Sequence, residues 1–139
     1  MLLLLSGGVG GAKLAKGFTG QADVDNLMII VNTGDDIELY GLNISPDIDI
    51  VIYTLAGIVN KQQGWGIDKD SFSTHTQLLK YTERVWFKLG DNDLATQLFR
   101  TKMLKEGKSL SEVTELIAES LQVKTCVVPM SDEKVETRI

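Results

Sequence analysis

The chain opens with MLLLLSGGVGGAK (residues 1–13), which joins a run of leucines to a cluster of glycines. Residues 2–5 form a short apolar run, which is typical of a strand buried on both faces of a parallel sheet. The glycines at 7–11 end this strand, and a helix is expected over residues 12–18. A second apolar run, Leu27–Val31, follows. Strand, glycine turn, helix and strand form a βαβ unit, so the sequence predicts an α/β fold with a mostly parallel sheet flanked by helices.

Later elements are predicted from end signals and periodicity. Ser45-Pro46-Asp47 indicates a helix start, because serine can cap, proline fits the first helical position and aspartate suits the positive helix end. Ser109 and Glu112 match a capping box before another helix. Further helices are expected over residues 70–81 and 94–106, and further strands over 85–89 and 124–128.

Composition restricts the function. The 139 residues suit one domain, and the net charge of −5 disfavours a protein that binds nucleic acid through many phosphate contacts. Cys126 is the single cysteine, so no internal disulfide can form. The apolar start is too short for a signal peptide or a membrane span, and a cytoplasmic protein is expected.

The first candidate site is the glycine loop itself. Gly7, Gly8, Gly10 and Gly11 let the backbone approach an anion, and Lys13 adds a positive charge. The loop matches neither the dinucleotide fingerprint nor the Walker A motif. Phosphate binding is the favoured interpretation, and a tight turn that uses glycines for packing alone is the alternative.

The second candidate site follows the second predicted strand. Asn32, Asp35 and Asp36, with Asp47 and Asp49 further on, supply hard oxygen ligands near the carboxyl end of that strand. Mg²⁺ prefers one or two carboxylates together with substrate phosphate oxygens, so this segment suits metal-assisted phosphoryl transfer. The alternative is a set of solvated loop acids, with Asp47 serving only the helix end.

The third candidate site is Lys88 with Asp91 and Asp93. Asp91 is equally well explained as a helix cap, and Lys88 as a solvated charge. His75 has no second histidine or nearby cysteine, so a surface position is favoured over a ligand role. Trp65, between two glycines, is the one tryptophan placed to approach a planar ring, although packing is the more common role.

Seven short motifs in series carry a family resemblance. They are SGGVGGAK (6–13), NTGDD (32–36), SPDID (45–49), GWG (64–66), KLGDND (88–93), LAT (94–96) and PMSD (129–132). In order and spacing they resemble the 2-phospho-L-lactate transferase family. The resemblance covers nearly the whole chain and continues through Glu136-Thr137-Arg138.

The resemblance implies a Rossmann-like, Mg²⁺-dependent enzyme of coenzyme F420 biosynthesis. Such an enzyme transfers a phospholactyl or phosphoenolpyruvyl group from a guanosine diphosphate-linked donor to the deazaflavin alcohol 7,8-didemethyl-8-hydroxy-5-deazariboflavin, releasing GMP. Its partners would be these small molecules, without nucleic acid or membrane, and a homodimer is left open.

The resemblance also implies roles for single residues. The glycine loop and Lys13 would hold donor phosphates. Asp35, Asp36 and Asp49 would bind Mg²⁺ and act in catalysis, with Asp49 also contacting the deazaflavin. The remaining substrate-binding residues implied are Asn32, Lys88, Asp91 and Asp93.

Members of that family are about twice as long. Residues 1–139 are therefore expected to form the amino-terminal part of one α/β transferase domain, with the remainder absent. A rival interpretation is a non-catalytic nucleotide- or UDP-sugar-binding regulator of the gluconeogenesis-factor type. That group has DDGGSS after the second strand, whereas Asp35 and Asp36 precede Ile37-Glu38-Leu39 here. A structural or oligomerisation domain is a third interpretation.

Overall fold

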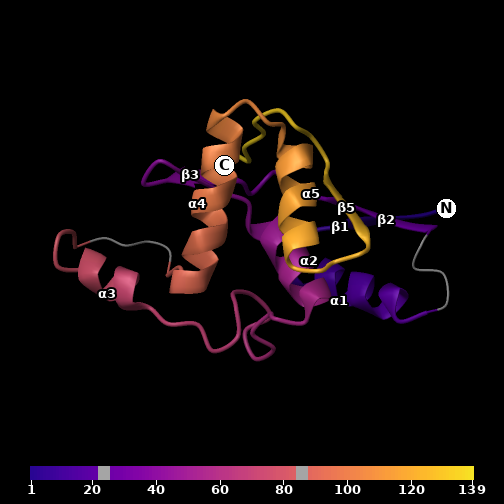
Figure 1. The fold of residues 1–139 in the computed structure, drawn as a ribbon, viewed down its shortest axis with the longest axis horizontal. Coiled ribbons are helices and arrows are strands. Elements are labelled where there is room, and N and C mark those ends of the chain that lie inside the picture. The colour runs from indigo at the N-terminus through magenta and orange to yellow at the C-terminus, as the bar shows by residue number, and fades with distance from the viewer. Residues whose placement is uncertain (22–25, 84–87) are drawn as a thin grey trace.

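The computed structural model describes residues 1–21, 26–83 and 88–139 (Figure 1). The strands are β1 (Leu2–Ser6), β2 (Leu27–Val31), β3 (Ile37–Leu39), β4 (Leu42–Ile44) and β5 (Cys126–Pro129). The helices are α1 (Gly8–Thr19), α2 (Pro46–Ala56), α3 (Ser73–Leu78), α4 (Asp91–Lys105) and α5 (Leu110–Ser120). No helix in these described ranges is both long and apolar enough to cross a membrane.

Three strands form a parallel sheet in the order β1, β2, β5. Ser6 pairs with Val31, and Val31 pairs with Pro129, so the carboxyl ends of the strands meet at one edge. The predicted α/β, Rossmann-like class and the three strands at the corresponding positions are confirmed. Of the strand predicted over residues 85–89, residues 85–87 lie outside the described residues, and Lys88 and Leu89 have no regular structure.

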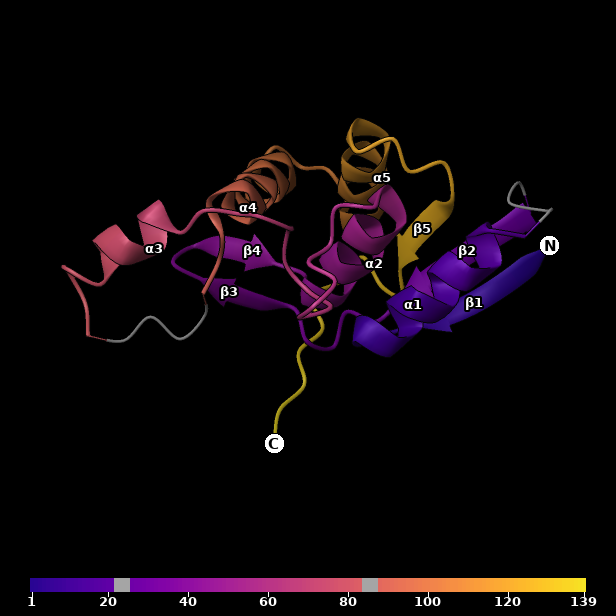
Figure 2. The same ribbon diagram turned by 90° about the horizontal axis from the view of Figure 1, so that it is seen from below.

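Helices α1, α2 and α5 cover one face of this sheet, whereas α4 lies over the β3–β4 hairpin (Figure 2). Leu27, Ile29 and Val127 point to that face and belong to the core that these three helices complete. The opposite face carries Leu3 and Leu5, which are 55% and 76% exposed. The expectation that residues 2–5 are buried on both faces is therefore wrong. The reason is that no described helix packs on this face, and β1 also lies at the edge of the sheet.

Helix α1 begins at Gly8, earlier than the predicted start at Ala12. Glycine is a poor helix former, which is why the pattern favoured the later start. The amide of Gly11 donates to the carbonyl of Gly7 over 3.2 Å and closes the first helical turn. A Cβ at position 11 would overlap the side chain of Ser6, so glycine allows α1 to pack directly against the end of β1.

The polar segment between β2 and α2 contains an antiparallel hairpin, β3–β4, that the sequence pattern did not predict. Helix α2 begins at Pro46, as predicted. Ser45 does not cap it with its side chain, contrary to expectation. Its hydroxyl instead donates to Asp36 Oδ2 over 2.7 Å, which ties the loop to the start of the helix.

The later helices follow the predictions closely at their starts. The capping box before α5 is confirmed, since the amide of Glu112 donates to Ser109 Oγ and the amide of Ser109 donates to Glu112 Oε2. Helix α4 begins at Asp91, near the predicted position. Helix α3 is shorter than predicted, because Asp70 and Ser71 bond to the start of α4 rather than joining α3.

Candidate functional site

The glycine turn and the end of β2 meet the first turn of α2. Asn32 Nδ2 donates to Asp47 Oδ2 over 2.8 Å. A Cβ added to Gly7 would lie 3.5 Å from Asp47 Oδ2, and one added to Gly8 would lie 3.8 Å from Asp47 Oδ1. Asp47 itself is buried. Gly7, Gly8, Asn32 and Asp47 are called the glycine-turn cluster below. It joins the first and second predicted sites at the carboxyl edge of the sheet.

The start of α1 presents backbone donors beside this cluster. Gly7 is extended and has no side chain to cap the helix. The first N–H groups of a helix lack intrahelical partners and, with the positive helix end, favour an anion. A Cβ at Gly10 would meet nothing within 4 Å, so this turn is open to an approaching group. The turn can therefore hold a phosphate.

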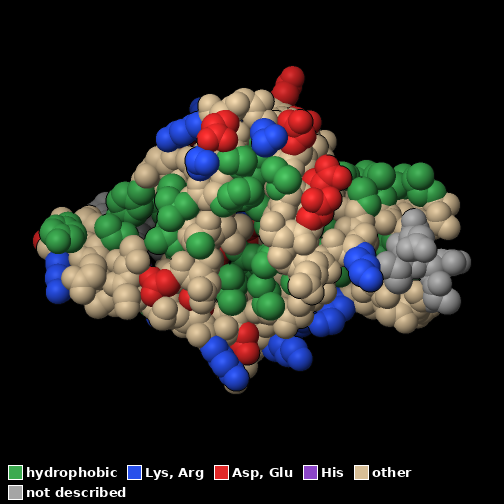
Figure 3. Space-filling model, viewed as in Figure 1, with side chains coloured by type: hydrophobic (Ala, Val, Ile, Leu, Met, Phe, Trp, Pro, Cys, Tyr) green, Lys and Arg blue, Asp and Glu red, His purple; other side chains and the backbone are tan. Residues whose placement is uncertain are grey.

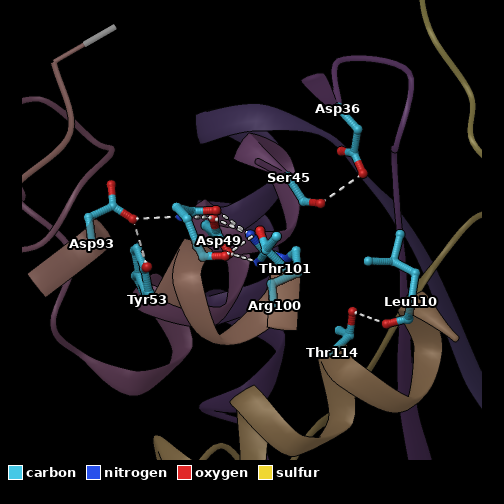
Figure 4. Close-up of polar contacts among 10 residues, drawn as sticks. Asp36, Ser45, Asp49, Tyr53, Asp93, Arg100, Thr101, Leu110 and Thr114 are labelled. Carbon is cyan, nitrogen blue, oxygen red and sulfur yellow. Dashed lines mark hydrogen bonds and ion pairs between the residues drawn. The ribbon is translucent and has the colours of Figure 1, made fainter. Parts of the chain in front are cut away.

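A second group of polar side chains lies between α2 and α4 (Figure 4). Asp49 and Tyr53 come from α2, whereas Asp93, Gln97 and Arg100 come from α4. All five are buried. They are called the buried network below. Because Asp47 and Asp49 share the first turn of α2, this turn links the glycine-turn cluster to the buried network.

Arg100 and Gln97 together engage both carboxylate oxygens of Asp49. Arg100 Nη2 pairs with Oδ1, and Arg100 Nη1 donates to Oδ2 over 3.2 Å. Gln97 Nε2 also donates to Oδ2, over 2.7 Å. Burial alone would lower the pKa of Arg100, but the charge and the hydrogen bonds of Asp49 together outweigh burial and raise this pKa, so the guanidinium stays protonated. A metal ion could bind Asp49 only in competition with these donors.

Asp93 is held through one oxygen. Tyr53 Oη donates to Asp93 Oδ1 over 2.8 Å, and Gln97 Nε2 donates to the same atom over 3.0 Å. Within the described ranges, Asp93 Oδ2 accepts no hydrogen bond. Burial, followed by the charge of Asp49, raises the pKa of Asp93 from 3.8 to about 6. Burial, with the charges of Asp49 and Asp93, also raises the pKa of Tyr53, so Tyr53 remains a neutral donor.

Two cavities border the buried network and share Trp65 and Asp93. The larger, of about 240 Å³, is lined by Ile44, Pro46, Asp49, Ile50, Trp65, Leu89, Asp93 and Gln97. The smaller, of about 160 Å³, lies along the segment that contains Gly66 and also includes Lys88. The larger cavity is therefore an apolar space with a few polar groups, as is typical of small-molecule sites.

Asp36 and Asp35 occupy different environments. Asp36 Oδ2 accepts the hydrogen bond from Ser45, while Asp36 Oδ1 is buried without a partner among the described residues. Burial raises the pKa of Asp36 to about 6, and the charges of Arg100, Asp49 and Asp47 also act on it. Asp35 is exposed. Of the two, Asp36 therefore lies closer to the charged groups of the site.

Lys13 lies among other lysines. With Lys16 and Lys61 it lines a cavity of about 180 Å³ beside Val9 and Gly64, and no member of the glycine-turn cluster lines this cavity. A Cβ at Gly64 would overlap Val9, so this residue must be glycine for the segment to pack on α1. The cavity is positively charged and borders α1, the helix that begins at Gly8 of the glycine-turn cluster.

Asp91 caps a helix, but a different one from that expected. It accepts hydrogen bonds from Ser71 Oγ (2.6 Å) and from the amides of Ser73 and Thr74 (both 3.0 Å), at the start of α3. The bond from Ser71, followed by that from the Thr74 amide, lowers the pKa of Asp91. Asp70 in return accepts from the backbone amides at the start of α4. This capping accounts for Asp91 without a ligand.

Lys88 packs over an aromatic ring at the edge of the smaller cavity. Its Nζ lies 4.2 Å from the centroid of the Phe72 ring. A cation in this position is attracted by the negative face of the ring. Since Lys88 and Asp93 line the same cavity, the third predicted site borders the buried network.

The donor set fits a Mg²⁺ ion only if substrate oxygens complete it. In the described part of the chain, no group of three or more His, Cys, Asp or Glu side chains is arranged to hold a metal. Mg²⁺ commonly takes one or two carboxylates and fills the other positions with water and phosphate oxygens. Such a pair is available in Asp36 Oδ1, which has no partner among the described residues, and the carboxylate of Asp47. These two groups lie close enough for their charges to interact.

Sequence reasoning missed Arg100, Gln97 and Tyr53. A signal for them exists, because Asp93, Gln97 and Arg100 recur at i, i+4 and i+7 and so share one face of a helix. Their partners on α2 cannot be identified from the sequence, since the pairing depends on how α2 and α4 pack. Asp47 was interpreted either as an oxygen ligand of the second site or as a helix-end residue, and the structure adds its bond to Asn32.

A family model described as 2-phospho-L-lactate transferase CofD matches residues 2–139. The matching model is thus that of the transferase and not that of a regulatory nucleotide-binding protein. Figure 1 shows that the matched range contains every helix and strand discussed above.

Individual relatives agree with this match. A phosphoenolpyruvate transferase of Streptomyces griseus is 43% identical over 139 residues, covering 99% of this chain and 44% of the relative. A 2-phospho-L-lactate transferase of Methanocaldococcus jannaschii is 40% identical over 139 residues, covering 100% of this chain and 45% of the relative. A phosphoenolpyruvate transferase of Thermobifida fusca is 38% identical over 148 residues. The chain spans less than half the length of these curated relatives.

Proposed function

This chain belongs to the 2-phospho-L-lactate transferase family, and we propose that it serves the transfer of a phospholactyl or phosphoenolpyruvyl group to a deazaflavin alcohol in coenzyme F420 biosynthesis. The donor in this proposal is linked to guanosine diphosphate. Relatives are named for each of the two acids, so the proposal covers both. The observation that carries it is the convergence of the glycine turn, Asn32 and Asp47 at the edge of the sheet where α/β folds bind ligands.

The donor diphosphate is placed at the glycine-turn cluster. The start of α1 offers backbone N–H groups and the positive helix end, and Gly10 leaves room for close approach. The carboxylate of Asp47 would repel a diphosphate at this position unless a cation lay between them. This repulsion supports a role for Mg²⁺ held by Asp36 and Asp47, which would neutralise phosphate charge when bound.

The acceptor is placed in the larger cavity. Its apolar lining, including Ile50, Trp65 and Leu89, suits a planar ring system. Arg100 balances the charge of Asp49, so Asp93 carries the remaining negative charge among the cavity's carboxylates. A hydroxyl donor is therefore favoured there over an anion.

The reaction requires a hydroxyl oxygen to attack the phosphorus that carries the three-carbon acid. The new O–P bond forms as the bond to the bridging oxygen breaks, GMP leaves, and the hydroxyl proton passes to a base. Asp93 Oδ2 is our choice for this base, because a carboxylate with a pKa of about 6 is ionised at neutral pH and can still take up a proton. The protein otherwise contributes positioning and charge neutralisation.

Calorimetric titration of the chain with GDP and with the deazaflavin alcohol tests the proposal, using Gly10→Ala and Gly17→Ala as a matched pair. A Cβ at either position of α1 meets nothing within 4 Å. Each variant should therefore fold and gain about 0.5–1 kcal/mol of stability. Gly10→Ala should weaken GDP binding by about tenfold, whereas Gly17→Ala should leave it unchanged.

Addition of a chelator should also weaken GDP binding by the parent chain, if Mg²⁺ bridges the diphosphate and the carboxylates. Absence of binding to both ligands would contradict the proposal. Equal GDP affinity of the two glycine variants would show that the glycine turn is not the binding site of the donor diphosphate.

A further inference from the structure

Arg100 lies behind the groups that face the larger cavity. Its side chain is completely buried and does not line the cavity, whereas Asp49 and Gln97, which it contacts, both do. Figure 4 shows Arg100 on the side of Asp49 away from Asp93. Any effect of Arg100 on a ligand must therefore pass through Asp49 and Gln97.

The contacts of Arg100 select one orientation of the Gln97 amide. Arg100 Nη1 donates to Gln97 Oε1, so the amide nitrogen must face the other way. There Nε2 donates to Asp49 Oδ2 and to Asp93 Oδ1. A reversed amide would set its N–H groups against the guanidinium and its oxygen against two carboxylates, which is unfavourable at every contact.

Stability alone does not explain this arrangement. A buried ion pair is commonly no more stabilising than well-packed apolar residues of similar volume. Helices α2 and α4 nevertheless place five polar side chains at their contact, beside a cavity that is otherwise largely apolar. The arrangement leaves Asp93 Oδ2 as the carboxylate oxygen of the network with no partner among the described residues.

We propose that Arg100 is a positioning residue, which fixes Asp49 and Gln97 so that Asp93 Oδ2 is presented to an uncharged hydroxyl ligand in the larger cavity. This inference rests on the proposed function for the identity of the ligand. It predicts that the fork geometry of Arg100, and not only its charge, is required, because lysine cannot donate to Asp49 and Gln97 in the same fixed plane.

The test compares Arg100→Lys with Val113→Ala, a cavity-forming change in α5 away from the network. Both variants should lower the melting temperature. Arg100→Lys should weaken binding of the deazaflavin alcohol by about tenfold or more while GDP affinity stays within about twofold of the parent. Val113→Ala should leave both affinities within about twofold. Similar losses of alcohol affinity in the two variants would overturn the proposal.

A readout without ligand separates this inference from the proposed function. The side-chain amide of Gln97, assigned by its loss in Gln97→Leu, should give two distinct NMR signals in the parent and in Val113→Ala. In Arg100→Lys these signals should move towards those of a solvated glutamine. If the parent binds neither ligand, the proposed function fails, and unchanged Gln97 signals in Arg100→Lys would then overturn the positioning role on their own.

Discussion

The protonation of Asp93 should couple the stability of the chain to pH. Its pKa rises from 3.8 to about 6 on folding, chiefly through burial, so the folded state binds its proton more tightly than the unfolded state. The resulting stabilisation is complete below pH 3.8 and is lost as the pH rises through about 6. Asp93→Asn mimics the protonated form. We expect it to exceed the parent by about 2 kcal/mol in urea unfolding at pH 7.5 and to match it near pH 3.5.

Asp91→Asn is the matched control, because the sign of its effect is opposite. Hydrogen bonds from Ser71 and from the Thr74 amide lower the pKa of Asp91, so its carboxylate stabilises the fold above the usual pKa and loses this effect in acid. Asp91→Asn should therefore be less stable than the parent at neutral pH. If Asp93→Asn were also less stable than the parent at pH 7.5, the assignment of a raised pKa to Asp93 would be wrong.

At the scale of residues, sequence reasoning identified the segments of the site better than the contacts within it. Asp49 and Asp93 were both selected, and one amide of Gln97 bonds to both. Arg100 was overlooked, because a single arginine in a helical sequence is usually interpreted as a solvated charge. Its burial becomes evident only when the packing of α2 against α4 is known. Lys13 was assigned by its spacing from the glycines, but a helical residue projects according to its face, and this face carries Lys16 as well.

The capping box of α5 provides a test at the scale of single elements. Ser109→Ala removes the acceptor for the amide of Glu112 and leaves a helix-end donor without a protein partner. We expect a loss of about 1 kcal/mol in the free energy of unfolding. Ser120→Ala, at the far end of the same helix, removes only the bond to the Leu116 carbonyl and should change stability by less than about 0.5 kcal/mol. Equal effects at the two ends would show that the box does not stabilise the helix.

Among the elements, strands and helix starts with strong local signals were predicted well, and those that depend on tertiary packing were not. The box at Ser109 and the proline at position 46 act within their own helices, so the sequence is sufficient to find them. The early start of α1 depends on the close approach of Gly11 to Ser6. The β3–β4 hairpin has strands of three residues each, which are too short for a periodic pattern to be recognised.

At the scale of the whole molecule, the sheet has one covered and one open apolar face. Figure 3 shows hydrophobic side chains gathered at the end of the molecule where the strands begin. Leu3 and Leu5 are exposed on the open face. The exposed Cys126 projects from the same side, because Leu3 pairs with Met28 and Met28 pairs with Cys126 in the parallel sheet. Exposed apolar faces and edge strands of this kind promote association.

We therefore expect the chain to associate at high concentration through this face. The double change Leu3→Lys and Leu5→Glu should weaken that association by about tenfold or more, because burial of each leucine contributes on the order of 1.5–3 kcal/mol. Its melting temperature at low concentration should stay near that of the parent, since both side chains are exposed in the monomer. Leu4→Glu is the control, because Leu4 packs against the core on the covered face and its replacement should unfold the chain.

Sedimentation velocity measures the association. Alkylation of Cys126 reports whether this face is the one involved, because it should be slower in the associated parent than in the double variant. Unchanged sedimentation of the double variant would place the contact elsewhere.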